Sequence, residues 1–339
     1  MISFITWTAN PDLISSPVTV RWYGLMFAIG FLVGYEIVYR IFKHEGAPEK
    51  WLAPLFFYVV IATVLGARLG HVLFYDWSYY SQHPGDILKI WEGGLASHGG
   101  TIGIIIAIFI FSWSVTKKID KKIIGPIILT FLSFFVGLLP FDALINDCIC
   151  WVLLILALCW AFSMDGVLWT LDRLCIPIGF VGALIRIGNL MNHEIYGGPT
   201  SMPWGFRFID NINQYMHGAE PIFTQPSHPT QLYEALCYLV VFAVCMYLYW
   251  RRNAQERPGF LLGVFLIGIF GSRFFIEFLK NVQEQWEIGL RQSIGLDQGQ
   301  LLSIPFVIAG IWLIVRAMRR PREELEYPNR FSDEKKDKK

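Results

Sequence analysis

Long apolar runs follow one another along almost the whole chain. They centre on residues 18–39, 52–74, 99–116, 123–141, 148–164, 171–191, 229–250, 259–279 and 299–317. The hydrocarbon core of a bilayer is about 30 Å thick, and about 20 helical residues cross it. The pattern therefore predicts nine membrane-spanning helices and an all-α fold, a polytopic helical bundle.

The composition supports this interpretation. Of the 339 residues, 54% are hydrophobic and only 16% are charged, and the mean hydropathy is +0.46. A soluble domain of this length is usually less apolar. Residues 1–17 lack the basic segment of a cleavable signal, so we expect the first run to remain as a helix. The formal net charge of +1 gives no sign of a nucleic-acid partner.

Basic residues are concentrated in alternate connections between the runs. They are Arg40, Lys43 and Lys50 after the first run, Lys117, Lys118, Lys121 and Lys122 after the third, and Arg251, Arg252 and Arg257 after the seventh. Positively charged connections stay in the cytoplasm. We therefore expect a multi-pass membrane protein with its N-terminus on the outer side and its C-terminus on the inner side.

The fourth and fifth runs are short and close together. Removing both leaves the orientation of every other run unchanged, so we interpret residues 123–165 as a hairpin inserted into seven core spans. Residues 192–227 are rich in proline and are predicted to fold as a small cap on the outer side of the membrane. We expect residues 1–318 to form a single transmembrane domain, and residues 319–339 to be a charged cytoplasmic tail.

Three arginines, Arg68, Arg186 and Arg273, lie inside apolar runs. Without partners they would cost about 8 to 10 kcal/mol together in a bilayer. Guanidinium groups that converge near the outer leaflet would form a bidentate oxyanion site, and the phosphate of a phospholipid is the oxyanion most available there. The arginines therefore favour a phosphate-binding site.

Acidic residues offer a purely structural alternative. Glu277 lies four residues after Arg273, on the same helix face, so these two residues are also consistent with a simple ion pair. Arg186 has no acidic residue at helical spacing within its run, and its candidate partners are Glu194 and Glu234. Both interpretations stay open from the sequence.

Other polar residues lie at the predicted outer ends of the runs. His98, between two glycine pairs, suits a general base or a hydrogen-bond donor to a phosphate, although a histidine at a membrane boundary is often merely interfacial. His228, Gln231 and Glu234 fit either a polar seam between helices or a headgroup pocket. Tyr23 is typical of an interfacial aromatic belt.

No metal or organic cofactor is expected. The six cysteines are Cys148, Cys150, Cys159, Cys175, Cys237 and Cys245. They form no CxxC and no Cys/His cluster with metal-ligand spacing, and we interpret them as small buried hydrophobic residues.

Seven blocks occur in one order along the chain: RWYGLMFAIGF, GARLGHVLFY, HGGTIG, RIGNLMNHEIYG, HPTQLYE, GSRFFIEF and GQLLSIP. In these blocks, over most of residues 18–318, the chain resembles the bacterial prolipoprotein diacylglyceryl transferases. The resemblance implies an enzyme of the bacterial inner membrane that moves the diacylglyceryl group of phosphatidylglycerol onto the lipobox cysteine at the signal peptide of a prolipoprotein. In that membrane the N-terminus and the cap of residues 192–227 would be periplasmic, and the C-terminus would be cytoplasmic. The cysteine sulfur attacks the glyceryl carbon, so that a thioether forms and glycerol phosphate leaves.

The resemblance also implies site residues, which fall on Tyr23, His98, Arg186, Asn189, Glu194, Gly197, Arg273 and Glu277. Departures from the family pattern are Arg21 where histidine is frequent, Ile185 and His193 where glycine is frequent, and the segment 123–165.

We expect Arg186 and Arg273 to hold the phosphate, with Glu277 orienting Arg273. Asn189 and Glu194 are expected to hold the glycerol headgroup, and the catalytic set also includes Tyr23 and His98. His98 is the candidate base, and its rival role is a hydrogen bond to the phosphate. Further candidate substrate-binding residues are Asn192, Gly197, His228, Gln231, Glu234 and Arg68. A phospholipid or anion transporter, in which the arginines bind a phosphate without bond cleavage, is the alternative function.

Overall fold

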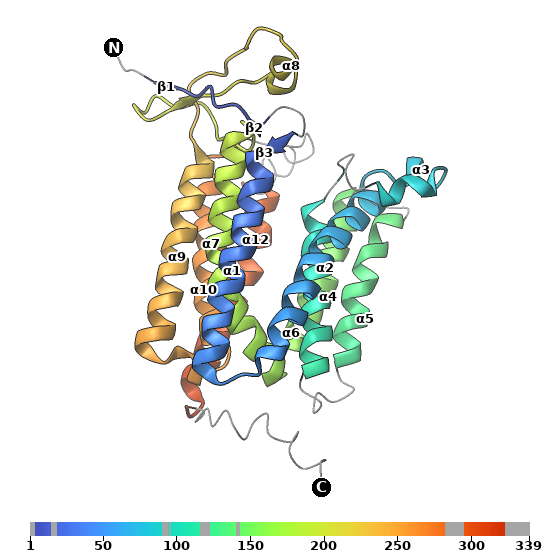
Figure 1. Ribbon diagram of the computed structural model, residues 1–339, viewed down its shortest axis with the longest axis vertical. Helices are drawn as coiled ribbons and strands as arrows, with labels where there is room; N and C mark the ends of the chain where they lie inside the picture. The colour runs from blue at the N-terminus through green and yellow to red at the C-terminus, as the bar shows by residue number, and fades with distance from the viewer. Residues whose placement is uncertain are drawn as a thin grey trace. The chain divides into compact units, whose positions relative to one another are not determined.

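The computed structural model describes residues 4–14, 19–89, 94, 96–115, 123–139, 143–281 and 295–322 (Figure 1). The longer helices are α1 (Trp22–Glu45), α2 (Leu52–Phe74), α4 (Ser97–Val115), α5 (Ile124–Ser133), α6 (Ala143–Ala161), α7 (Asp165–Met191), α9 (Thr230–Arg252), α10 (Phe260–Glu277) and α12 (Gln298–Arg319). The short helical elements are η1 (Glu49–Trp51), α3 (Trp77–Tyr80), η2 (Pro84–Leu88), η5 (Phe134–Leu138), α8 (Ile212–Met216) and η6 (Ala254–Glu256). The strands are β1 (Ile5–Thr6), β2 (Asp12–Ile14), β3 (Val20–Arg21) and β4 (Phe206–Arg207).

The helices confirm the predicted polytopic membrane bundle. In the described residues, six are long and apolar enough to cross a bilayer: Trp22–Glu45, Glu49–Phe74, Gly166–Met191, Thr230–Arg252, Phe260–Glu277 and Gly299–Arg319. Three shorter apolar helices, Gly99–Ser114, Ile124–Val136 and Ile149–Ala161, correspond to the third, fourth and fifth predicted runs.

The fourth run does not form one regular helix. It is α-helical to Ser133 and continues as the 3-10 helix η5. The Thr130 hydroxyl donates to the Pro126 carbonyl at 2.8 Å, and the Ser133 hydroxyl donates to the Thr130 carbonyl at 2.6 Å. Such bonds from side chain to backbone compete with the regular helical ladder.

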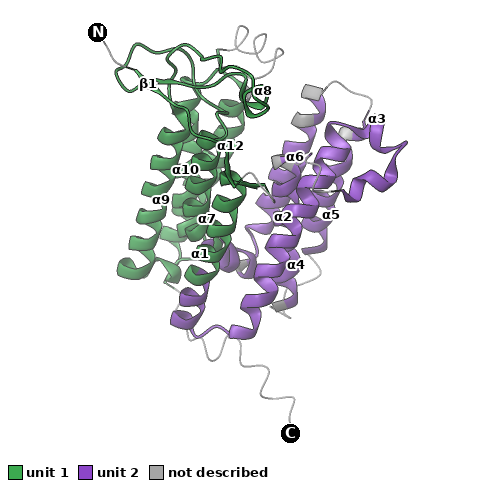
Figure 2. Cartoon of the chain, turned by 45° about the horizontal axis from the view of Figure 1, so that its top comes forward, with its two compact units in different colours: residues 1–37, 174–322 green, residues 38–173, 323–339 purple. Residues whose placement is uncertain are grey.

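The chain divides into two compact units (Figure 2). Unit 1 comprises residues 1–37 and 174–322, and unit 2 comprises residues 38–173 and 323–339. The helices α1 and α7 therefore contribute their N-terminal and C-terminal parts, respectively, to unit 1.

In unit 2, α2 and α4 approach each other through glycines. A Cβ atom on Gly99 would collide with the Gly66 carbonyl and would lie 2.6 Å from the Gly70 Cα atom. The Ala96 N–H donates to the Ala67 carbonyl at 2.9 Å, just before α4 begins. These contacts fix the first turn of α4, which carries His98, against the backbone of α2.

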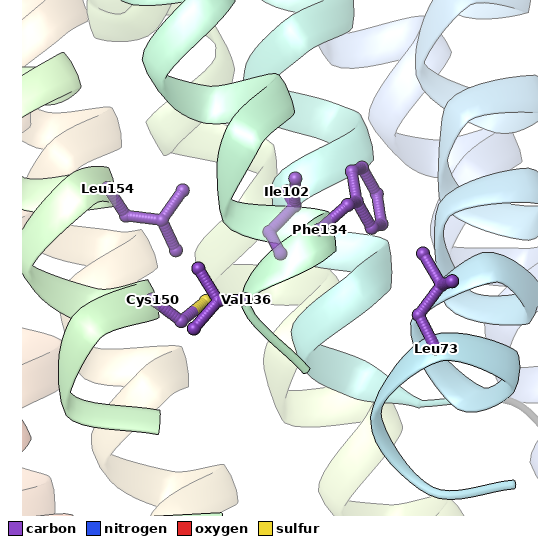
Figure 3. Close-up of a cluster of buried hydrophobic side chains, with 6 residues drawn as sticks. All are labelled: Leu73, Ile102, Phe134, Val136, Cys150 and Leu154. Atoms are coloured by element: carbon purple, nitrogen blue, oxygen red, sulfur yellow. The ribbon is translucent and has the colours of Figure 1, made fainter. Parts of the chain in front are cut away.

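An apolar cluster connects α2 and α4 to η5 and α6 in the same unit. Figure 3 shows its buried members, which are Leu73, Ile102, Phe134, Val136, Cys150 and Leu154. The segment predicted as a hairpin thus packs on the core of unit 2. A buried ion pair lies in the same unit, where the Arg173 Nε atom is 2.9 Å from Glu45 Oε1. The Trp169 indole N–H donates to the same carboxylate.

In unit 1, α10 packs on both α9 and α12. A Cβ atom on Gly263 or on Gly310 would lie 2.8 Å from the carbonyl oxygen of the other, so α10 and α12 make close backbone contact there. Helix α12 begins with a capping box between Asp297 and Gln300.

A small β-structured cap lies at one end of the unit 1 helices (Figure 1). Strand β1 pairs in parallel with β4, and Leu190, Phe206 and Phe208 form an apolar cluster against Trp7 and Tyr196. The Tyr196 hydroxyl donates to Asp210 at 3.0 Å. Burial and this hydrogen bond raise the pKa of Tyr196 to about 12.

Candidate functional site

The loop after α7 folds back toward the helix that precedes it. His193 and Ile195 adopt positive φ angles of 56° and 60°, and the Glu194 N–H donates to the Asn189 carbonyl at 3.1 Å. The Glu194 carboxylate then accepts from Asn189 Nδ2 at 2.7 Å and from Asn192 Nδ2 at 3.2 Å. The turn thus gathers three of the predicted site residues around one carboxylate.

Arg186 lies one turn earlier in α7 and is held from two sides. Its Nε atom is 2.6 Å from Glu234 Oε2, and its Nη1 atom donates to Asn189 Oδ1 at 3.2 Å. The Glu234 side chain, from α9, is completely buried, and the side chain of Arg186 is 17% exposed. Of the two partners that the sequence suggested for Arg186, Glu234 is the one that forms the ion pair.

Lys280, which was not predicted as a site residue, joins the remaining charges. Its Nζ atom is 2.8 Å from Glu234 Oε1 and 3.1 Å from Glu277 Oε2. It lies beyond the end of α10 at Glu277, so its spacing of three residues from Glu277 is only a weak signal in the sequence.

Arg273 is the most loosely held cation of the group. Its Nε atom is 3.7 Å from Glu277 Oε2, which is too long for a hydrogen bond. Within the described part of the chain, this Nε atom is buried and has no hydrogen-bond partner. Arg273 and Glu277 thus form the ion pair that their spacing allows, at a distance that leaves the Arg273 Nε atom without a hydrogen bond to Glu277.

Together these five residues form what we call the ion network: Arg186, Glu234, Arg273, Glu277 and Lys280. In it, three cations share two carboxylates. Charges in a low-dielectric interior are stabilised only when they are balanced and hydrogen-bonded. The ion network taken by itself therefore has one cation more than it has carboxylates, and the Glu194 carboxylate adjoins it through Asn189.

Glycines let backbone segments approach this network closely. A Cβ atom on Gly197 would collide with the Leu279 carbonyl, and one on Gly299 would lie 2.6 Å from the Glu277 carboxyl carbon. The Gly197 N–H donates to the His228 carbonyl at 2.8 Å. The loop after α7, the start of α9 and the end of α10 are therefore held together at the predicted position of Gly197.

Residues at the start of α9 complete this wall. The Gln231 side chain donates to the Glu194 carbonyl at 2.6 Å, and Gln231 and Glu234 thus form a polar seam that is continuous with the predicted site loop. His228 Nδ1 lies 3.2 Å from the Tyr233 hydroxyl, which accepts from the Trp204 indole at 2.9 Å.

Tyr23 belongs to the same unit and packs on α7. A Cβ atom on Gly188 would lie 2.7 Å from the Tyr23 ring, so only glycine at that position leaves room for it. The ring also packs against Phe27, with 5.2 Å between the centroids. Tyr23 therefore contacts the last turns of α7, and the charges of Glu194 and Arg186 both act on its hydroxyl.

Two predicted site residues belong to unit 2. Arg68 is 3% exposed and donates to the carbonyls of Asp86, Ile87 and Gly94 at 2.6, 2.9 and 3.2 Å. His98 lies in the first turn of α4, and its side chain falls outside the described residues. The role of His98 therefore stays a prediction.

The described residues include no group of three or more His, Cys, Asp or Glu side chains suited to a metal ion.

The family model and the relatives that match this chain all belong to the same family. A family model described as prolipoprotein diacylglyceryl transferase matches residues 11–137 and 148–316. The match runs through most of the segment 123–165 and leaves out only residues 138–147.

Three relatives carry the name phosphatidylglycerol–prolipoprotein diacylglyceryl transferase. The protein of Porphyromonas gingivalis is 48% identical over 94% of this chain and 96% of its own length. That of Tolumonas auensis is 40% identical over 91% and 96%. That of Chloroherpeton thalassium is 35% identical over 95% and 97%.

Proposed function

The chain belongs to the prolipoprotein diacylglyceryl transferase family, and from this premise we propose how its ion network serves the reaction. The protein is a membrane transferase that moves the diacylglyceryl group of phosphatidylglycerol to prolipoproteins. The proposal concerns the site residues, their roles and the orientation of the chain in the membrane.

The ion network binds the phosphate of phosphatidylglycerol. The observation that carries this proposal is that Arg186, Arg273 and Lys280 share only two carboxylates. A phosphodiester supplies one negative charge and several acceptor oxygens, and charge-assisted hydrogen bonds to guanidinium groups are strong. Arg273, whose Nε atom has no hydrogen-bond partner in the described part of the chain, is the residue best placed to bind it.

The amides and carboxylate of the loop after α7 bind the glycerol headgroup. Asn189 and Asn192 both donate to Glu194, so its carboxylate is oriented and can accept from a glycerol hydroxyl. Glu277 orients Arg273, and Tyr23 lines the site from α1. Gly197, His228, Gln231 and Glu234 form the wall on the side of α9.

The reaction is a displacement at carbon. The thiol sulfur of the lipobox cysteine attacks the glyceryl carbon that bears the phosphate, the C–S bond forms as the C–O bond breaks, and the bonding electrons go to the phosphate oxygen. The phosphate gains a negative charge on leaving. A site with surplus positive charge therefore binds the leaving group more tightly than the substrate, which accelerates the step.

The thiol proton requires an acceptor. His98 is the proposed base, on the strength of the HGG block and of the usual histidine pKa near 6.5, which suits this role at neutral pH. In the rival role His98 donates a hydrogen bond to the phosphate. A His98→Gln variant keeps a hydrogen-bonding side chain but cannot act as a base, so near-normal turnover of this variant would exclude the base role.

The chain is oriented with its N-terminus in the periplasm and its C-terminus in the cytoplasm of the bacterial inner membrane. The alternation of basic connections supports this orientation. In this arrangement residues 1–318 form the transmembrane domain, residues 192–227 form a periplasmic cap over the site, residues 123–165 form an accessory hairpin, and residues 319–339 form a cytoplasmic tail.

The test is transfer itself. Purified protein is incubated with phosphatidylglycerol vesicles and a lipobox peptide, and mass spectrometry measures the addition of diacylglycerol to the cysteine. Arg273→Gln should lose most transfer. Arg319→Gln, which removes an exposed arginine in the last turn of α12, is the matched control and should retain it. Phospholipid flipping without peptide modification would instead favour the transporter.

A further inference from the structure

His193 lies in an unusual backbone conformation at the edge of the site. Its φ angle is 56°, in the left-handed region that residues other than glycine seldom adopt. The family pattern frequently has glycine at this position, which has no such penalty. His193 is nevertheless 4% exposed and well packed, with the Phe208 ring edge-on at 6.2 Å between centroids. Its side-chain contacts must therefore offset the backbone strain.

Both ring nitrogens of His193 have backbone partners. The Ile209 N–H donates to Nδ1 at 3.1 Å, and Nε2 lies 2.9 Å from the Ala9 carbonyl oxygen. A carbonyl oxygen can only accept, so Nε2 carries the proton and Nδ1 carries none. The two bonds therefore exist together only in the neutral imidazole.

These two bonds connect three segments of unit 1. Ala9 belongs to the N-terminal arm, Ile209 belongs to the cap, and His193 lies directly between Asn192 and Glu194 in the site loop. His193 adopts its strained, positive φ angle in the turn that brings Glu194 back to Asn189. Loss of either bond frees the loop to relax, and Glu194 then loses its fixed orientation.

We propose that His193 is a positioning residue for Glu194, and that protonation of His193 releases the site loop and lowers transferase activity in mildly acidic conditions. A protonated ring presents an N–H at Nδ1 to the N–H of Ile209, and this contact is repulsive. The proposal rests on the assignment of Glu194 to the substrate site described above.

Among the described residues, no charged group acts on His193 to favour its protonation. Burial lowers its pKa from the ordinary value of 6.5, and the Ala9 carbonyl partly opposes this effect. The titratable groups on the neighbouring segments are engaged elsewhere. Asp12 of the arm pairs with Arg21, Asp210 of the cap accepts from Tyr196, and Glu194 accepts from two asparagines.

The sign of the pH dependence follows from the lowered pKa. When folding lowers the pKa of a group, the stability that this group contributes is fully present at pH values above its pKa in the unfolded protein. That contribution is lost as the pH falls through its pKa in the folded protein. The loop should therefore be fully held above about pH 6.5, the unperturbed histidine value, and should loosen below it.

The first test compares His193→Asn with the unmodified protein across this pH range. Asparagine tolerates a positive φ angle, its carbonyl oxygen can accept from Ile209, and it does not titrate. The ratio of kcat/KM values, variant over unmodified protein, cancels the pH dependence of the thiol chemistry. This ratio should rise about threefold to tenfold between pH 7.5 and pH 5, the range expected for loss of one hydrogen bond. A ratio that stays constant would overturn the proposal.

The second test measures the loop without using activity. Hydrogen exchange at the Ile209 amide should accelerate relative to that at the Phe206 amide as the pH falls, because Phe206 donates to the Ser227 carbonyl, which does not titrate. In His193→Gly this relative change should disappear. Equal behaviour of the two amides in the unmodified protein would overturn the positioning role even if transfer is confirmed. If the Ile209 amide shows the expected acceleration at low pH but the protein transfers no diacylglyceryl group, only the proposed function is refuted.

Discussion

The Arg186 Nε atom lies 2.6 Å from the Glu234 Oε2 atom, and the Glu234 side chain is completely buried between α7 and α9. The same carboxylate also contacts Lys280 through its other oxygen. One buried carboxylate thus forms ion pairs with two cations, and the ion network has more cations than carboxylates.

Glu234→Ala should therefore destabilise the protein strongly. It leaves Arg186 and Lys280 with one carboxylate fewer in a buried setting, and breaking a buried ion pair from one side costs about 3 to 5 kcal/mol. Thermal unfolding in detergent should show a lower Tm than for the unmodified protein. Glu234→Gln keeps an acceptor oxygen and should lose less. Equal Tm values for the alanine variant and the unmodified protein would show that the pair contributes nothing.

Lys280→Met removes the surplus charge of the ion network. Two arginines and two carboxylates then remain, so the site should bind phosphatidylglycerol less tightly. The KM for this lipid should rise about tenfold or more, since hydrogen bonds to charged groups contribute about 1.5 to 3 kcal/mol. Lys280→Arg keeps the charge and should restore most of the affinity. An unchanged KM in the methionine variant would separate Lys280 from substrate binding.

Neighbouring glycines offer a matched steric comparison. A Cβ atom on Gly197 collides with the Leu279 carbonyl, whereas the nearest atom to one on Gly198 is 3.5 Å away. Overpacking costs about 1 to 3 kcal/mol of stability, so Gly197→Ala should lower the Tm and, because it displaces the site loop, should also lower kcat/KM. Gly198→Ala should stay near the unmodified value. Similar losses in both variants would point to a general intolerance of this turn.

Arg68→Lys tests whether Arg68 binds substrate or supports its own unit. The guanidinium donates to three backbone carbonyls, which the single ammonium group of lysine cannot reproduce. We expect a lower Tm and a lower kcat, with little change in the KM for phosphatidylglycerol. A raised KM with normal stability would instead support the substrate-binding role predicted from the sequence.

The helices could be predicted because each apolar run carries its own signal of length and hydropathy. The break in the fourth run could not, because it depends on the hydroxyls of Thr130 and Ser133 bonding to nearby carbonyls rather than to solvent. The turn after α7 was also hidden. Its positive φ angles occur at a histidine and an isoleucine, where sequence patterns do not predict them.

The site could be predicted only in part, for a similar reason. The polar residues of α7, α9 and α10 stood out singly because a charge inside an apolar run needs an explanation. Their pairing depends on contacts between segments remote in sequence, such as Arg186 with Glu234. Lys280 was missed because it follows the apolar run, where a lysine is ordinary, and only the fold turns it toward Glu234 and Glu277.

The central claim is that the ion network binds the phosphate of the substrate and of the leaving group. Isothermal titration of glycerol phosphate into the purified protein measures this directly, without peptide or chemistry. The account predicts binding to the unmodified protein and to Arg319→Gln, and at least about tenfold weaker binding to Arg273→Gln, which removes a charged partner. Equal affinity for Arg273→Gln and the unmodified protein would contradict the account.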